Sequence, residues 1–132
     1  KKLSSNLNCD FIGLISDKKD LYKLIAGAKI FVYPSMLEAM SMMLLEVAAI
    51  GTPIICADID GNIDLFKNNE VTFFKNGDIQ DLSKKIQETL SRLTEVSQMA
   101  ISLKERLSKE QSWSSIALKY DMLYKKIINK NY

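Results

Sequence analysis

The stretch FVYPSMLEAMSMMLLEVAAIGTPII, residues 31–55, has the pattern of a strand, a loop, a helix and the start of a second strand. Residues 41–50 are apolar at almost every position, which is typical of a helix buried on all sides. Gly51 then provides the residue that most easily adopts a left-handed conformation at a helix end, before Thr52 and Pro53 begin the next strand. This order predicts an α/β fold, with a Rossmann-like parallel sheet and helices on both faces.

The same alternation of β-rich and helical patterns covers the first part of the chain. We expect strands at four places: residues 9–12, 29–33, 53–57 and 71–74. The segment SDKKDLYKLIAGA, residues 16–28, predicts an amphipathic helix over the sheet, with Ser16 or Asp17 as its N-terminal cap. Its apolar stripe consists of Leu21, Leu24, Ile25 and Ala28. A short helix is expected at residues 63–67.

The strand pattern ends after Phe74, and the remaining sequence predicts a helical C-terminus. The expected helices cover residues 79–93, 96–108 and 112–129. The last of them carries a large apolar stripe that we expect to pack back over the body of the domain. Its members are Trp113, Ile116, Ala117, Tyr120, Leu123, Tyr124 and Ile127.

Composition narrows the classes of function. The 132 residues are 47% hydrophobic and 26% charged, which predicts one domain with a real core. The net charge of +2 is spread along the chain, and this argues against nucleic acid as a partner. No apolar run reaches the roughly 20 residues of a transmembrane helix, so we expect a soluble, cytoplasmic chain, with peripheral membrane association of a longer parent protein left open.

Two residue counts bear on chemistry. Cys9 and Cys56 each lie in a short apolar run, and we interpret both as small core residues in a reducing compartment. The sequence contains no histidine, which excludes Ser-His-Asp and Cys-His catalysis and any histidine-containing metal site. Carboxylates, lysines, tyrosines and backbone groups are left to carry any reaction.

Two glutamates flank the start of the apolar helix. Glu46 lies inside that helix, where a carboxylate needs a partner or a wet cavity, so either a neighbouring lysine or a ligand would satisfy it. Glu38 lies in the loop after Pro34 and Ser35, at the carboxyl edge of the sheet, where ligands bind in open α/β folds. A helix N-terminus attracts phosphate, whereas carboxylates accept hydrogen bonds from hydroxyls. The combination suggests a ligand with both phosphates and sugar hydroxyls.

Residues 9–66 resemble a known family. Their sequence is CDFIGLISDKKDLYKLIAGAKIFVYPSMLEAMSMMLLEVAAIGTPIICADIDGNIDLF. It is similar to the second domain of retaining glycosyltransferases of the GT-B fold, the E-x7-E group called glycosyl transferases group 1. The resemblance covers residues 11–74, and residues 113–128 resemble the family's closing helix. It implies an incomplete second domain of a GT-B fold.

The resemblance implies roles for particular residues. Glu38 matches the first glutamate of the motif, which contacts donor-sugar hydroxyls near the reacting carbon and is the candidate catalytic residue. Glu46 matches the second glutamate, which holds the ribose hydroxyls of the nucleotide. The backbone N–H groups of Met40, Ser41 and Met42 match those that contact the phosphate or the sugar of the donor in the family. Gly13, Leu14 and Ile15 match the positions at which the family's main chain flanks the nucleotide base.

The resemblance also implies a reaction and missing parts. It implies transfer with retention from a nucleoside diphosphate sugar, in polysaccharide biosynthesis, with no bound metal or other cofactor. The family's basic phosphate clamp and acceptor-binding domain would precede Lys1, so residues 1–132 are expected to form a single partial domain that is inactive alone. In the family's strand order 3-2-1-4-5-6, two strands would be missing from the middle of the sheet. The missing N-terminal domain, a rearrangement or a second copy of the chain would close that edge.

Departures and alternatives remain open. Ala39, Met40 and Ser41 stand where the family often has Gly-Phe-Gly, and Asp64 stands where it often has glutamate. A non-catalytic module for nucleotide-sugar binding or assembly is the alternative function. Another doubly wound phosphate-binding domain would need a G-x-G-x-x-G or Walker A sequence, which is absent. Asp58 and Asp60 form a D-x-D tripeptide that we interpret as a capped loop and not as a metal site.

Overall fold

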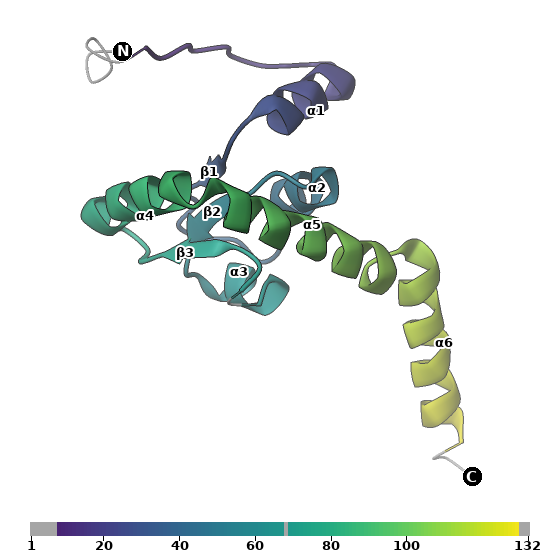
Figure 1. Ribbon diagram of the computed structural model, residues 1–132. Coiled ribbons are helices and arrows are strands. Elements are labelled where there is room, and N and C mark those ends of the chain that lie inside the picture. Colours follow the sequence, from purple (N-terminus) through teal and green to yellow (C-terminus); the bar gives the residue numbers. More distant parts are fainter. Residues whose placement is uncertain (1–7, 68, 130–132) are drawn as a thin grey trace.

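The computed structural model describes residues 8–67 and 69–129. A three-stranded parallel sheet with the order β1-β2-β3 lies at the centre, and helices cover both of its faces (Figure 1). The strands are β1 (Phe31–Tyr33), β2 (Ile54–Ala57) and β3 (Thr72–Phe74). The predicted α/β class is therefore confirmed, as are three of the four predicted strands.

The two faces of the sheet are covered by different helices. Ile54 and Cys56 of β2 face a core that includes residues of α2 (Met42–Ile50) and α5 (Leu93–Glu110). Ile55 and Ala57 point to the opposite face, where the packed side chains include two from α4 (Ile79–Ser91). This alternation is the period of two that a strand buried on both faces requires.

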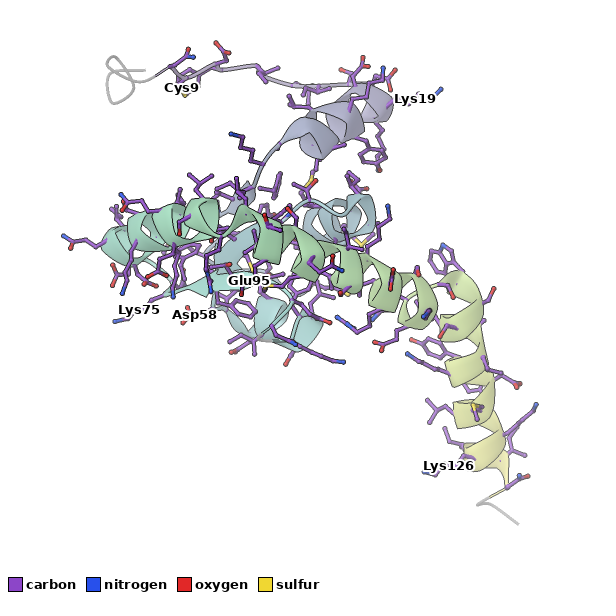
Figure 2. All side chains as sticks on the ribbon, viewed as in Figure 1. Cys9, Lys19, Asp58, Lys75, Glu95 and Lys126 are labelled. Atoms are coloured by element: carbon purple, nitrogen blue, oxygen red, sulfur yellow. The ribbon has the colours of Figure 1, made fainter. Side chains whose placement is uncertain are left out.

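The predicted strand at residues 9–12 is wrong. Residues 8–17 have no regular secondary structure, and the segment lies beyond α1 (Lys18–Gly27), away from the sheet (Figure 1). A strand is stable only when a neighbour satisfies its backbone groups, and among the described residues β1 pairs with β2 alone. Cys9 is exposed in this extended segment (Figure 2), which contradicts its interpretation as a core residue, whereas Cys56 is buried as expected.

Helix α1 begins where the sequence predicts. Asp17 is its N-cap and accepts a hydrogen bond of 2.7 Å from the N–H of Lys19. Ile25 is buried, but Leu24 is half exposed, because α1 packs mainly against α2 and not over the sheet. The expected position over the sheet is therefore wrong. The hydroxyl of Thr52 donates a hydrogen bond of 2.9 Å to the carbonyl of Ile25 and ties the end of α1 to the start of β2.

Helix α2 confirms the prediction most closely. Ser41 is the N-cap, and its hydroxyl accepts a hydrogen bond of 3.3 Å from the N–H of Leu44. Gly51 ends the helix with a φ of 94°, in the left-handed region. The next helix, α3 (Asp60–Leu65), begins three residues earlier than predicted.

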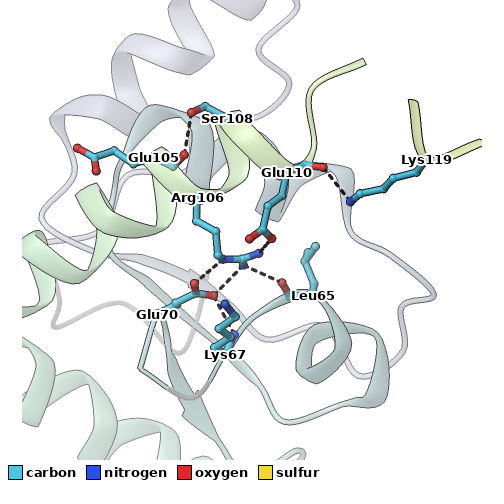
Figure 3. Close-up of polar contacts among 8 residues, drawn as sticks. All are labelled: Leu65, Lys67, Glu70, Glu105, Arg106, Ser108, Glu110 and Lys119. Carbon is cyan, nitrogen blue, oxygen red and sulfur yellow. Dashed lines mark hydrogen bonds and ion pairs between the residues drawn. The ribbon is translucent and has the colours of Figure 1, made fainter. Parts of the chain in front are cut away.

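An ion-pair network fixes α5 to the body of the domain (Figure 3). The guanidinium of Arg106 donates to both carboxylate oxygens of Glu70, to the carbonyl of Leu65 at 3.3 Å and to Glu110 at 2.7 Å. Leu103 and Leu107 of the same helix are buried in the core. The network and the apolar face together hold α5 across α2.

The predicted packing of the last helix is wrong. Helix α6 (Trp113–Ile128) forms as expected, but it extends away from the body (Figure 1), and none of its residues is buried. Trp113 is 87% exposed, and apolar side chains project along the length of the helix (Figure 2). An apolar stripe needs a complementary surface, and past the end of α5 the described part of the chain does not supply one.

Candidate functional site

The carboxylate of Glu38 is held by two hydroxyl groups. Glu38 lies in the loop between β1 and α2, and it is half buried. Tyr33 Oη donates to Glu38 Oε1 at 2.8 Å, and Ser35 Oγ donates to the same oxygen at 2.9 Å. An ionised carboxylate accepts hydrogen bonds at both oxygens, so Oε2 remains available for a further donor.

The backbone of the same loop is held from the other side by α3. A Cβ added to Gly61 would clash with the carbonyl oxygen of Glu38 and would lie 2.8 Å from that of Ala39. The side-chain amide of Asn76 donates to the carbonyl of Met36 at 3.4 Å. Only glycine therefore allows α3 to approach the loop this closely. The sequence did not predict the contacts that Tyr33 and Gly61 make with Glu38. Tyr33 directly precedes the Pro-Ser pair and Gly61 directly follows the D-x-D tripeptide, and these positions were the available signals.

The N-terminus of α2 follows Glu38 directly. The first N–H groups of a helix have no acceptor within the helix, and the hydroxyl of Ser41 satisfies only that of Leu44. The first turn of α2 contains no acidic residue, so the positive end of the helix dipole is not neutralised there. The backbone N–H groups of Met42 and Met43 are consequently suited to an anion, while the Ser41 side chain is buried and engaged as the cap.

Glu46 is paired in this structure. Lys18 Nζ at the start of α1 lies 2.7 Å from Glu46 Oε1. The side chain of Glu46 is 23% exposed and that of Lys18 is 71% exposed. The hydrogen bond to Glu46 raises the pKa of Lys18 above its ordinary value. Lys18 is thus the neighbouring lysine that the sequence left open as a partner of Glu46. An ion pair of this exposure contributes little to stability, so Glu46 is not a buried structural charge.

A cavity of about 580 Å³ lies beside Glu46, between α2, α5 and the start of α6. Its walls are mainly apolar. Three of the predicted site residues, Met40, Met42 and Glu46, line it together with Leu45 and Ala49 of α2. Leu107, Trp113 and Ile116 close the opposite side. The structure thus brings Met40, Met42 and Glu46 to one concave surface of the size that small ligands occupy.

The remaining predicted site residues lie elsewhere. Gly13, with a φ of 75°, Leu14 and Ile15 belong to the irregular segment before α1, and Leu14 is 92% exposed. They do not line the cavity beside Glu46. Their segment leads into α1, whose first residue, Lys18, contacts Glu46, and their predicted contact with a nucleotide base stays a prediction.

The aspartates of the D-x-D tripeptide have structural environments. Asp58 Oδ1 accepts a hydrogen bond of 2.7 Å from the N–H of Asn76, which confirms the interpretation of a capped loop. Asp60 lies in the first turn of α3. Residues 8–67 and 69–129 contain no group of three or more His, Cys, Asp or Glu side chains arranged to hold a metal ion.

Comparison with known proteins decides the family. Residues 1–106 match the family described as glycosyl transferases group 1. The chain belongs to this family. Sugar transfer is the general activity of the glycosyl transferases group 1 family. The match also confirms the resemblance that residues 9–66 suggest.

Relatives of this glycosyl transferases group 1 chain are much longer than the chain itself. It is 27% identical over 126 residues to the N,N'-diacetylbacillosaminyl-diphospho-undecaprenol alpha-1,3-N-acetylgalactosaminyltransferase of Campylobacter jejuni, covering 92% of this chain and 32% of that protein. The sucrose-phosphate synthase of Thermosynechococcus elongatus has a TM-score of 0.77 and 25% identity, over 92% of this chain and 30% of the synthase. The chain therefore spans about a third of the length of these two relatives.

The solved structures agree on the fold. TarM superposes with a TM-score of 0.66 and 22% identity, covering 77% of this chain and 21% of TarM, which supports the fold alone. Together with the synthase, it confirms the predicted GT-B type of domain. In the part of the chain that the structure describes, no helix combines the length and apolar character needed to cross a membrane.

Proposed function

We propose that this chain is the donor-binding portion of a glycosyltransferase that moves a sugar, with retention, from a nucleoside diphosphate sugar to an acceptor. The observation that carries the proposal is the order of groups along one edge of the sheet. Glu38 with a free Oε2, the uncapped N–H groups of Met42 and Met43, and Glu46 follow one another within nine residues of chain, 38–46. Hydroxyl acceptors on either side of an anion site match a nucleotide sugar.

Each group has a role in this proposal. Glu38 accepts hydroxyls of the transferred sugar near its reacting carbon and is the candidate catalytic residue. The N-terminus of α2 meets the diphosphate and stabilises negative charge as the sugar leaves. Glu46 accepts the ribose hydroxyls, and main chain at Gly13, Leu14 and Ile15 flanks the base. In this proposal no metal or other cofactor is required, because the helix end of this chain and the basic clamp of the longer transferase supply the positive charge.

The acceptor and the pathway belong to the whole protein. One relative is named as an N-acetylgalactosaminyltransferase that acts on N,N'-diacetylbacillosaminyl-diphospho-undecaprenol. We therefore propose a glycan-building reaction, in polysaccharide biosynthesis, for the parent of this chain. The unpaired thiols of Cys9 and Cys56 support a reducing, cytoplasmic compartment.

The partner in this proposal is the rest of a longer transferase, or a second copy of the chain. Two observations support the need for one. Among the described residues, β1 has a neighbour on one side only, and α6 leaves a long apolar stripe exposed. These same features favour the alternative function, a non-catalytic module for nucleotide-sugar binding or assembly.

The test is an NMR titration of the chain with uridine diphosphate, guanosine diphosphate and their hexose conjugates. Binding at the proposed site shifts the amide signals of Met42 and Met43. The amides of Gln80 and Asp81 at the start of α4 serve as an internal control, because Asp78 already caps them. The titration is repeated on a longer polypeptide that includes any coding sequence before Lys1. If no amide at the start of either helix shifts in either protein, the donor-binding function is excluded.

A further inference from the structure

We propose that Tyr33 is a positioning residue for the sugar subsite of this chain. Its hydroxyl, together with that of Ser35, holds Oε1 of Glu38 and leaves Oε2 for a hydroxyl of the donor sugar. The inference rests on the proposed function, because it names the residue that orients the sugar-binding carboxylate. It separates recognition of the sugar, which depends on Tyr33, from recognition of the nucleotide, which does not.

The ring of Tyr33 is fixed by the sheet. Tyr33 is the last residue of β1 and pairs in parallel register with Cys56 of β2. Its ring stacks on that of Phe31 with centroids 6.2 Å apart and planes 19° apart, and both rings pack against the main core. The core therefore determines the position of the hydroxyl, and this hydroxyl links the carboxylate of Glu38 to β1.

The loop backbone is held independently of Tyr33. Gly61 packs directly against the carbonyl groups of Glu38 and Ala39, and Asn76 donates to the carbonyl of Met36. Removing the Tyr33 hydroxyl should therefore leave the loop in place and release only the carboxylate of Glu38. The freed side chain then samples several rotamers, and binding of the sugar must restrict them again.

The positions of the two donors indicate that they orient the carboxylate of Glu38 and do not neutralise its charge. Tyr33 and Ser35 approach the same oxygen, from the strand and from the loop respectively, at 2.8 and 2.9 Å. Two donors at one oxygen restrict the rotation of the Glu38 side chain. The hydroxyl of Ser35 also lies 3.3 Å from the carbonyl of Leu37, so the hydroxyl of Tyr33 is the stronger restraint. Neither donor carries a charge, so Glu38 keeps its full capacity as an acceptor at Oε2.

The experiment compares Tyr33→Phe with wild type in calorimetric titrations of the chain. Each protein is titrated with uridine and guanosine diphosphate, free and as the hexose conjugate. We expect the affinity for the conjugate to fall about three- to tenfold, as for one lost hydrogen bond, while the affinity for the free diphosphate stays the same. Tyr120→Phe, which removes an exposed hydroxyl on α6, is the matched control and should change neither affinity.

A double-mutant cycle tests whether Tyr33 acts through Glu38. In a Glu38→Ala background, Tyr33→Phe should have no further effect on binding of the conjugate. An equal loss in that background would show that Tyr33 touches the sugar itself and would overturn the inference. Equal loss for free diphosphate and conjugate, or no loss at all, would overturn it as well.

The result for wild type separates this inference from the proposed function. Binding of the diphosphate without any gain from the attached sugar refutes the sugar subsite and leaves the nucleotide site intact. Binding of neither ligand refutes the proposed function and the inference with it. Ser35→Ala provides a second variant, for which we expect a loss of conjugate affinity in the same direction as for Tyr33→Phe.

Discussion

Lys18 Nζ and Glu46 Oε1 are 2.7 Å apart, and this contact joins the start of α1 to the second turn of α2. The pair places a positive charge beside a carboxylate that we propose as the ribose acceptor. An incoming diphosphate is attracted by the lysine and repelled by an unpaired glutamate. The pair therefore tunes the local potential of the site more than it stabilises the fold.

The first prediction concerns Lys18. Changing Lys18 to Met should weaken binding of a nucleoside diphosphate by a factor of about two to five, because the neutralising charge at Glu46 is lost. The difference from wild type should shrink as salt is added, since screening reduces the contribution of exposed charges. Lys19→Met, at the neighbouring exposed position (Figure 2), is the control, and calorimetric titration at two salt concentrations is the measurement.

The second prediction concerns the network around Arg106. Arg106→Met leaves the largely buried carboxylate of Glu70 without its main partner and should lower the free energy of unfolding by about 2 kcal/mol. Arg92→Met removes an exposed pair with Glu95 at 3.4 Å and should change stability little. Urea unfolding measures both variants. Equal effects would mean that the network in Figure 3 does not fix α5.

The same network predicts an acid dependence. Burial alone would raise the pKa of Glu70, but the hydrogen bonds from Arg106 and from the N–H of Lys67 outweigh it and lower the pKa below 4.5. A carboxyl with a depressed folded-state pKa adds stability above its unfolded pKa and loses this contribution as the pH falls through the folded value. The stability of wild type should therefore decline more steeply below pH 4.5 than that of Glu70→Gln. Urea unfolding across this range would contradict the account if the two slopes were the same.

The third prediction concerns Gly61. An alanine here would place its Cβ against the carbonyl of Glu38, so Gly61→Ala should displace the loop and reduce stability by about 1–3 kcal/mol. Gly27→Ala is the matched control, because its Cβ meets nothing within 4 Å and α1 gains about 0.5–1 kcal/mol of helix propensity. Thermal unfolding distinguishes them. A Gly61→Ala protein as stable as wild type would show that the loop does not contact α3 so closely.

The fourth prediction uses the two cysteines. Burial raises the pKa of the Cys56 thiol to about 12, whereas Cys9 is exposed. Iodoacetamide at pH 8 should therefore label Cys9 quickly and Cys56 only after unfolding, as peptide mass spectrometry will show. A thiol with a raised folded-state pKa also loses its stabilising contribution as the pH rises from about 9 towards 12, so Cys56→Ala should have a flatter alkaline decline.

Local sequence signals predicted α2 and β2 well. The helix has its own cap in Ser41 and its own stop in Gly51, and β2 is a short apolar run buried on both faces. The strand expected at residues 9–12 failed because a strand depends on a partner elsewhere in the chain, which an apolar pattern does not reveal. The position of α6 failed for the same reason, since its apolar stripe does not specify the surface that covers it.

The site shows the same division. The sequence predicted the helix start between Glu38 and Glu46, which the structure confirms, whereas the binding roles of the two glutamates stay predictions. It did not predict that Tyr33 would hold Glu38 or that Lys18 would pair with Glu46, 28 residues away. Contacts of this kind depend on the path of a loop and on the packing of α1 against α2, and neither is encoded in a local pattern.

In the proposed function, Glu46 binds the nucleotide and does not serve the fold. Calorimetric titration of Glu46→Gln with uridine and guanosine diphosphate, alongside thermal unfolding, tests it most directly. Glu88→Gln, at an exposed position of α4, is the control. We predict that Glu46→Gln lowers nucleotide affinity about tenfold or more and leaves the melting temperature nearly unchanged. A large fall in melting temperature with unchanged affinity would contradict the account and make Glu46 a structural residue.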